Sequence, residues 1–183
     1  VAPGVRAGAD QAVDEGQTLS LVSTFRDVGI LDTHSAVIDW GDTTSIAFAS
    51  LTETDGRGTI LADHVYADNG TYTVTVTVTD DDGASTSDSF AVLVSNVAPT
   101  LNAGPDQAVV EGATVDLFHM EQFFLFGVPI FEFPVNDTTF NDQGTLDSHT
   151  ATIDWGDETG VQVAVVSESP SGPPGSTAGD GGF

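Results

Sequence analysis

The strongest constraint on the fold is that the chain repeats itself. The sequence VAPGVRAGADQAVDEGQTLSL at Val1–Leu21 returns as VAPTLNAGPDQAVVEGATVDL at Val97–Leu117. The sequence FRDVGILDTHSAVIDWGD at Phe25–Asp42 returns as FNDQGTLDSHTATIDWGD at Phe140–Asp157. The first pair is offset by 96 residues and the second by 115, so the second copy carries 19 additional residues. A repeat of this period predicts two similar modules joined near Asn96-Val97. We therefore expect two domains, residues 1–96 and residues 97–183.

The local sequence pattern is that of β-strands. Thr71–Thr79 reads TYTVTVTVT, in which Val alternates with Thr or Tyr, as in a strand with one apolar and one polar face. Asp82-Gly83 and a second alternating run, Ala84–Ser95, follow it, which predicts a hairpin with a positive φ at Gly83. Further strands are expected at Gln17–Ser23, Ser35–Trp40 and Thr59–His64. No segment shows sustained helical periodicity, so the chain is expected to be all-β and built from antiparallel sandwiches.

Several motifs of the first module resemble the PKD (polycystic kidney disease) repeat family. They are Trp40-Gly41-Asp42, His64-Val65-Tyr66, Asn69-Gly70-Thr71-Tyr72-Thr73-Val74 and Asp80–Gly83. One departure is Thr43, where the family usually has Gly. The resemblance implies tandem immunoglobulin-like sandwiches with extracellular or cell-surface roles. Trp40 and the corresponding Trp155 are expected to be core anchors.

The second module matches this pattern only in part. Trp155-Gly156-Asp157 is present, but nothing after it matches the His64-Val65-Tyr66 motif or the Tyr72–Thr79 strand. The second sandwich is therefore expected to be incomplete, with its last two or three strands missing. Two explanations are open, because the chain could be part of a longer array or another copy could supply the strands.

The additional residues of the second module form an aromatic segment. Phe118–Val135 reads FHMEQFFLFGVPIFEFPV and marks an insertion at about residues 118–136. It is expected either to fold over its own module as a long loop or hairpin, or to form an assembly surface. The residues that would carry assembly contacts are Phe123, Phe124, Phe126, Ile130, Phe131 and Phe133.

The composition excludes several classes of partner. The chain has 28 acidic residues against three basic ones, a formal net charge of −25, and no Cys. Nucleic acids and anionic membranes are not expected partners, because binding their phosphates requires Lys and Arg. The longest apolar stretch, Phe123–Phe133, is interrupted by Pro129 and Glu132 and is far shorter than the roughly 20 residues of a membrane-spanning helix.

Acidic residues favour a divalent cation instead, and calcium is the cofactor that we expect. In an immunoglobulin-like sandwich, the loop after the second strand and the final hairpin turn lie at the same pole. Acids of the second module also repeat those of the first beside the link between the modules, where a shared cation would stiffen the link. Calcium binds six to eight oxygen ligands. The candidate metal ligands are Asp27, Asp32, Asp80, Asp81, Asp82, Asn96, Asp142 and Asp147. The opposite pole of the first module is expected to hold Glu15, Asp42 and Asp68.

No catalytic arrangement is expected. Ser, His and Asp occur together in Asp32-Thr33-His34-Ser35 and again in Asp147-Ser148-His149-Thr150. Because both motifs recur at the same position of the repeat, they fit a structural loop better than a single active site. Two glycosylation sequons begin at Asn69 and Asn136.

These observations predict an extracellular structural or adhesive protein that is not an enzyme. Its expected partners are other copies of itself, joined head to tail by strand exchange and aromatic contacts, with polysaccharide and cell-surface proteins as further candidates. Two alternatives remain open: a non-catalytic spacer or substrate-binding module of a large secreted hydrolase, and an enzyme in its own right.

Overall fold

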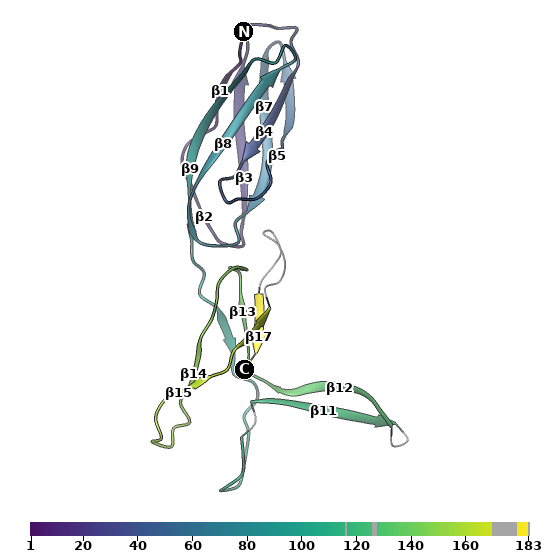
Figure 1. Cartoon of the computed structure of the whole chain (residues 1–183), viewed down its shortest axis with the longest axis vertical. Helices are drawn as coiled ribbons and strands as arrows, with labels where there is room; N and C mark the ends of the chain where they lie inside the picture. Colours follow the sequence, from purple (N-terminus) through teal and green to yellow (C-terminus); the bar gives the residue numbers. More distant parts are fainter. Residues whose placement is uncertain (116, 126–127, 170–178, 183) are drawn as a thin grey trace. The chain divides into compact units, whose positions relative to one another are not determined.

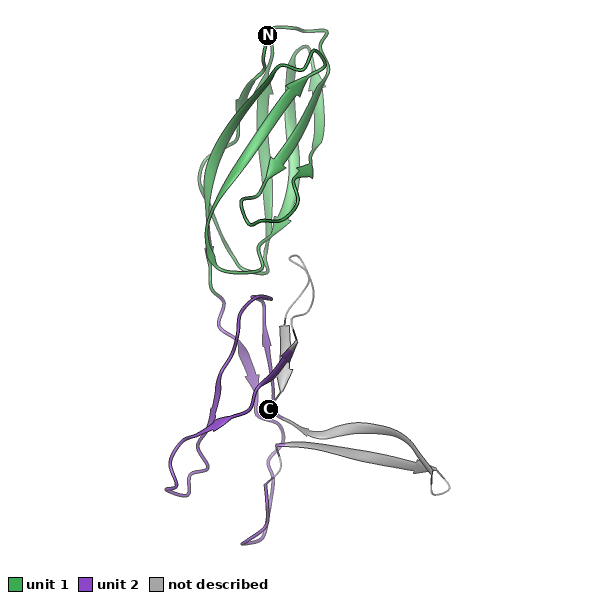
Figure 2. Cartoon of the chain, in the orientation of Figure 1, with its two compact units in different colours: residues 1–96 green, residues 97–183 purple. Residues whose placement is uncertain are grey.

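The computed structural model of the 183-residue chain divides into two compact units, residues 1–96 and 97–183 (Figure 2). It describes residues 1–115, 117–125, 128–169 and 179–182, and only the backbone at residues 118–125, 128–137, 169 and 179–182. Every element in these ranges is a β-strand, which confirms the all-β prediction. The described part of the chain contains no helix long and apolar enough to cross a membrane.

The first unit is a sandwich of two sheets (Figure 1). One sheet contains, in spatial order, β1 (Gly4–Arg6), β3 (Thr18–Arg26), β7 (Arg57–Val65) and β6 (Ser50–Thr54). The other contains β2 (Gln11–Asp14), β9 (Ser85–Ser95), β8 (Gly70–Asp80), β4 (His34–Asp39) and β5 (Ala47–Phe48). The strands expected from the sequence are all present, and the predicted sandwich is confirmed.

Alternation along the strands builds the core of the first unit. In β8, Val74, Val76 and Val78 are fully buried, and the Thr residues between them face outward. In β3, Leu19, Leu21 and Phe25 are buried in the same way from the opposite sheet. The β8–β9 turn has φ +85° at Gly83, as predicted, which lets the two longest strands pair along their whole length.

An aromatic stack closes one end of this core. The Trp40 and His64 rings are stacked with centroids 4.6 Å apart, and Tyr66 meets the His64 ring edge-on at 4.7 Å. Tyr66 stacks in turn on Tyr72, and its hydroxyl donates a 3.0 Å hydrogen bond to the Trp40 carbonyl. The expectation that Trp40 anchors the core is confirmed, since only 2% of its surface is exposed.

Within the residues that the structure describes, the second unit repeats the first only in part. Its strands are β10 (Thr100–Asn102), β11 (Phe118–Leu125), β12 (Val128–Asp137), β13 (Thr139–Asp142), β14 (Ala151–Ile153), β15 (Gln162–Ala164), β16 (Ser167–Ser169) and β17 (Gly179–Gly182). The register of several pairs is the same as in the first unit. Phe140 of β13 lies opposite Gly181 of β17 as Phe25 lies opposite Gly58, and β14 pairs with β15 as β4 pairs with β5.

Counterparts of β8 and β9 do not occur among the described residues of the second unit. This explains why the sequence QAVV at residues 107–110 forms no strand, although QAVD forms β2 in the first unit, where it pairs in parallel with β9. It also makes the expectation for Trp155 wrong. Trp155 is 39% exposed. In the first unit, Trp40 is enclosed by His64 at the end of β7 and by Tyr66 in the loop that follows. The described part of the second unit contains no counterpart of these two residues.

The aromatic segment of the second unit forms an antiparallel hairpin. Strands β11 and β12 pair with each other and with no other described strand, and the register shifts at His119/Met120 and at Phe123/Phe124. Phe126 lies outside the described residues, and the side chains of Phe123, Phe124, Ile130, Phe131 and Phe133 are likewise outside the description. Their assembly role therefore stays a prediction.

Candidate functional site

The candidate site lies at the pole of the first unit where β3 and β8 end and β4 begins. A tight loop after β3 builds its first half. The Asp27 amide donates to the Gly56 carbonyl at 2.7 Å, and the Gly29 amide donates to Asp27 Oδ1 at 2.8 Å. A side chain at Gly29 would collide with the Asp32 carboxylate, since a Cβ there would lie 2.0 Å from Asp32 Oδ2. Gly29 thus allows the loop to hold Asp32 close to Asp27.

Three carboxylates meet at this pole, as the sequence predicted for the first module. One carboxylate oxygen from each of Asp27, Asp32 and Asp80 lies within 4.8 Å of the other two. Asp27 and Asp80 are buried and Asp32 is half-buried. Carboxylate oxygens at this spacing are the ligands that calcium prefers.

Asp80 contributes the atom that best indicates a ligand. Its Oδ1 accepts a 2.8 Å hydrogen bond from the Ala84 amide in the hairpin turn. Its Oδ2 is buried and has no hydrogen-bond partner among the residues that the structure describes. A buried carboxylate oxygen without a partner is costly, and a cation held between the three carboxylates would remove that cost.

His34 connects the carboxylates to the neighbouring sheet. Its Nδ1 lies 2.7 Å from Glu53 Oε2 and its Nε2 lies 3.3 Å from Asp27 Oδ2, and its ring packs against Phe25. Burial opposes the charged imidazolium, but Glu53 and Asp27 outweigh it and raise the pKa of His34. The Gly29 amide lowers the pKa of Asp27 more than burial raises it, and His34 adds to the lowering.

The second unit repeats this arrangement without the Asp80 component. His149 Nε2 lies 2.9 Å from Asp142 Oδ2 and Nδ1 lies 2.8 Å from Glu168 Oε2. The hydrogen bonds to Asp142 and Glu168 raise the pKa of His149. The Gly144 amide donates to Asp142 Oδ1 at 2.8 Å, as Gly29 does to Asp27. The described part of this unit has no strand corresponding to β8, so it offers no third carboxylate equivalent to Asp80.

Sequence reasoning missed both glutamates and the pairing of each histidine with two carboxylates. The signal was present in the repeat, because Asp27, His34 and Glu53 each recur after 115 residues as Asp142, His149 and Glu168. The expectation that the motifs around His34 and His149 belong to structural loops fits their geometry, since each histidine bridges two carboxylates.

The other predicted ligands of the first unit lie outside the group formed by Asp27, Asp32 and Asp80. Asp81 and Asp82 are exposed in the β8–β9 turn and are not part of the group of three. Asn96 is exposed at the end of the first unit, and the Asp147 amide donates to the Gly144 carbonyl in a turn of the second unit. The cation predicted at the link between the modules stays a prediction.

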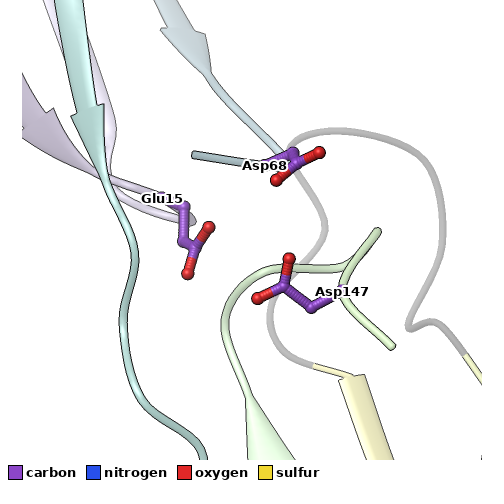
Figure 3. Close-up of side chains that lie close together, drawn as sticks. All are labelled: Glu15, Asp68 and Asp147. Carbon is purple, nitrogen blue, oxygen red and sulfur yellow. The ribbon is translucent and has the colours of Figure 1, made fainter. Parts of the chain in front are cut away.

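The opposite pole of the first unit holds the acidic residues expected there. Glu15 is buried, and one of its carboxylate oxygens lies within 4.8 Å of a carboxylate oxygen of Asp68 (Figure 3). Asp42 Oδ2 lies 2.6 Å from His64 Nε2, beneath the aromatic stack. Asp147, also labelled in Figure 3, belongs to the turn of the second unit. Asn69 is exposed in the loop before β8, and the side chain of Asn136 is outside the described residues.

The histidine bridge predicts how the stability of the first unit depends on pH. The pKa of His34 is raised in the folded state. The charged His34 therefore adds to the free energy of unfolding, fully at pH values below its unfolded pKa of about 6.5. This stabilisation is lost as the pH rises through the pKa of the folded state. We expect His34→Gln to cost about 1–3 kcal/mol at pH 5.5 through weakened hydrogen bonds to Asp27 and Glu53. The cost should shrink toward pH 8.5.

The measurement is urea unfolding in a chelator, followed by Trp40 fluorescence in a Trp155→Phe background. A difference in stability between the parent chain and the His34→Gln chain that stays constant from pH 5.5 to 8.5 would contradict a charged His34 in the folded state.

Comparisons with known proteins bear on the first unit. A sequence profile described as "PKD domain" matches residues 1–94. Among solved structures, the chain is similar to one described as "M1 domain from titin", with 19% identity and a TM-score of 0.29. That match covers 50% of this chain and 92% of the titin domain. No curated protein matches the chain.

Proposed function

Because the chain belongs to the PKD-domain family, we propose that it is a non-catalytic structural or adhesive protein that joins copies of itself head to tail. PKD domains are commonly extracellular, and we place this chain at the cell surface or in the extracellular matrix. The proposed link between copies is strand exchange, in which a neighbouring copy completes the second unit.

The observation that carries this proposal is the free edge of β14. In the first unit, β4 lies between β5 and β8, with Ala36 opposite Val78 and Ile38 opposite Val76. In the second unit, β14 pairs with β15, and its other edge has no partner among the described strands. An open strand edge is a template for pairing with another chain.

Apolar surface accompanies this edge. A cavity of about 260 Å³ in the second unit is lined by Pro99, Leu101, Phe140, His149, Ala151 and Val166, together with Thr150 and Thr152. In the first unit, Val5, Phe25 and Ala36 occupy the positions of Leu101, Phe140 and Ala151, and they pack in one core with Val78 of β8 and Phe90 of β9. The cavity therefore corresponds to space that apolar side chains of a β8–β9 hairpin fill.

The β11–β12 hairpin is the proposed donor. Like β8 and β9, its strands are consecutive and antiparallel, and they pair with no other described strand. The alternating sequence Phe131-Glu132-Phe133 suits a strand with one apolar face. Donor and acceptor are different surfaces, so the contact is heterologous and propagates into a filament unless its rotation closes a ring.

A proline on the free edge of β14 tests the proposal. The Ala36 carbonyl accepts a hydrogen bond from Ala49 on the β5 side, so Val37 directs its backbone groups toward β8. Thr152 is the equivalent of Val37. Thr152→Pro therefore removes a donor from the free edge and leaves the β14–β15 hydrogen bonds in place. We expect ordered filaments of the wild-type chain by negative-stain electron microscopy and none for Thr152→Pro.

Thr152→Val is the matched control, since it keeps the backbone donor and should assemble like the wild type. The unfolding of the first unit, reported by Trp40 fluorescence, should be unchanged in both variants. Dispersed monomers of the wild-type chain at high concentration, or filaments that Thr152→Pro does not affect, would contradict strand exchange.

We further propose that Asp27, Asp32 and Asp80 bind calcium and stiffen the first unit. The buried Asp80 Oδ2 without a partner among the described residues supports this site, together with the spacing of 4.8 Å or less between oxygens of the three carboxylates. Calcium would supply no chemistry beyond charge neutralisation and cross-linking of the loop to the hairpin turn. The test is the calcium dependence of the melting temperature in the wild type and in Asp80→Asn.

A further inference from the structure

All three basic residues of the chain other than histidine gather on one face of the first unit. They are Arg6, Arg26 and Arg57, and they come from the neighbouring strands β1, β3 and β7. Arg26 lies directly opposite Arg57, and Arg6 lies opposite Thr24, two residues from Arg26 on the same strand. All three are exposed, while Phe25 between them points into the core, so the arginines occupy the outer face of the sheet.

The surface around them is hollowed. A hollow of about 760 Å³ is lined by the three arginines, by Thr24, Thr52, Thr54 and Thr59, and by one acidic residue, Glu53, whose Oε2 lies 2.7 Å from His34 Nδ1. Gly4 lies opposite Arg26 and adds no side chain beside it. We call this surface the arginine hollow. Its donors are three guanidinium groups and several hydroxyls, a set suited to carboxylates.

The three guanidinium groups have no ion pair or hydrogen bond within the part of the chain that is described. Arg26 and Arg57 are like charges directly opposite each other on paired strands, which is unfavourable by itself. The chain has 28 acidic residues, yet none of those that the structure describes pairs with these three arginines. An anionic partner would convert it from a repulsive into an attractive arrangement.

We propose that the arginine hollow binds the acidic turn Asp81-Asp82 of a second copy of the chain. This turn is the tip of the β8–β9 hairpin, and both residues are exposed. Charge complementarity favours this occupant, since each copy carries a protruding pair of carboxylates and one basic hollow. Arg26 directly precedes Asp27 in the chain, and the Asp27 carboxylate lies within 4.8 Å of the carboxylate of Asp80. Asp80 in turn directly precedes the acidic turn Asp81-Asp82.

The hollow and the acidic turn therefore lie at the same pole of the first unit. When the turn of one copy enters the hollow of another, the reverse contact can form at the same time. Such a contact is isologous and closes as a two-fold pair. It involves β1, β3, β7 and the β8–β9 turn, so it is separate from the strand exchange proposed for β14. With both contacts present, filaments would associate in pairs.

Salt should affect this pairing in two opposing ways. Each copy carries a net charge of −25, so long-range repulsion opposes pairing at low ionic strength. The screening length is about 30 Å at 0.01 M salt, about 8 Å at 0.15 M and about 3 Å at 1 M. Pairing should therefore be strongest near 0.15 M, where the long-range repulsion is screened and contacting ion pairs are not. It should weaken toward both extremes.

Charge reversal gives a direct test by sedimentation velocity of the full chain, in a chelator and in the Thr152→Pro background. Arg57→Glu places Glu against Asp82, and Asp82→Arg places Arg against Arg57, so each variant alone should pair at least about tenfold more weakly. A mixture of the two variants restores opposite charges at both contacts. The mixture should form heterodimers with an affinity close to that of the parent.

Asp14→Arg is the control, because Asp14 is exposed in β2 and this variant changes the net charge by as much as Asp82→Arg. It should pair at least as well as the parent. A parent that stays monomeric at every salt concentration, or a mixture that fails to pair, would overturn the proposal. A third outcome would also overturn it: Arg57→Glu chains that self-associate like the parent but no longer bind alginate, an acidic polysaccharide. Strand exchange is tested independently, by the loss of filaments in Thr152→Pro. The proposal for β14 can therefore fail while the arginine contact is confirmed, and the reverse is also possible.

Discussion

Replacing Tyr66 by Ala is expected to destabilise the first unit by about 3–5 kcal/mol, the range for removing a large buried aromatic side chain. Tyr66 is fully buried, packs edge-on against His64 and stacks on Tyr72 with ring centroids 4.4 Å apart. Its removal opens a cavity beside Trp40 and leaves the Trp40 carbonyl without its hydrogen bond. Urea unfolding of the Trp155→Phe chain, followed by Trp40 fluorescence, measures this effect.

Tyr66→Phe separates the hydrogen bond from the packing. It keeps the stacked ring and removes only the hydroxyl that donates to the Trp40 carbonyl. The expected cost is about 1–3 kcal/mol, because a buried carbonyl loses its partner. Equal losses in the Ala and Phe variants would show that the ring contacts contribute little, contrary to the packing seen in the core.

Calcium is expected to raise the melting temperature of the first unit, and Asp80→Asn is expected to abolish that effect. At a free calcium concentration of about 100 times the dissociation constant, binding adds about 2.7 kcal/mol to the stability of the folded state. For a domain of this size that corresponds to a rise of about 10 °C or more. In a chelator, Asp80→Asn should be at least as stable as the wild type, because it removes one of three crowded negative charges.

Asp81→Asn is the matched control for this experiment. Asp81 adjoins Asp80 in the same turn but is exposed and lies outside the group of three carboxylates. Its calcium-dependent shift should equal that of the wild type. A wild-type chain whose melting temperature is the same in calcium and in chelator would refute the site, and equal losses in both variants would indicate a diffuse charge effect.

Much of the first unit could be predicted from the sequence because its information is local. Alternation of Val with Thr in β8 sets which face is buried, and Asp82-Gly83 sets the hairpin that fixes its register with β9. The crowding of Asp27 with Asp80 was also accessible, because the order of strands in such a sandwich brings these loops to one pole. The sequence could not show that Asp81 and Asp82 lie outside this group of carboxylates. Both belong to the same turn as Asp80, and only the direction of their side chains distinguishes them from it.

The exposure of Trp155 shows where local pattern fails. Trp40 and Trp155 lie in nearly identical sequences, IDWGD in both copies. Trp40 is buried because His64 and Tyr66 arrive from the far end of β7, more than 20 residues later. The second unit has no described counterpart of that contact, so the same local sequence has a different environment.

The sequence by itself determined the long strands of the first unit, with their inward and outward faces, because alternation and turn residues act over a few positions. The repeat likewise indicated two similar modules. Only the tertiary structure decided that His34 bridges Asp27 and Glu53, and that Arg6, Arg26 and Arg57 meet on one face. These groups are separated by up to 51 residues in the chain. Their neighbours depend on strand order and register, which are set by the packing of the whole core.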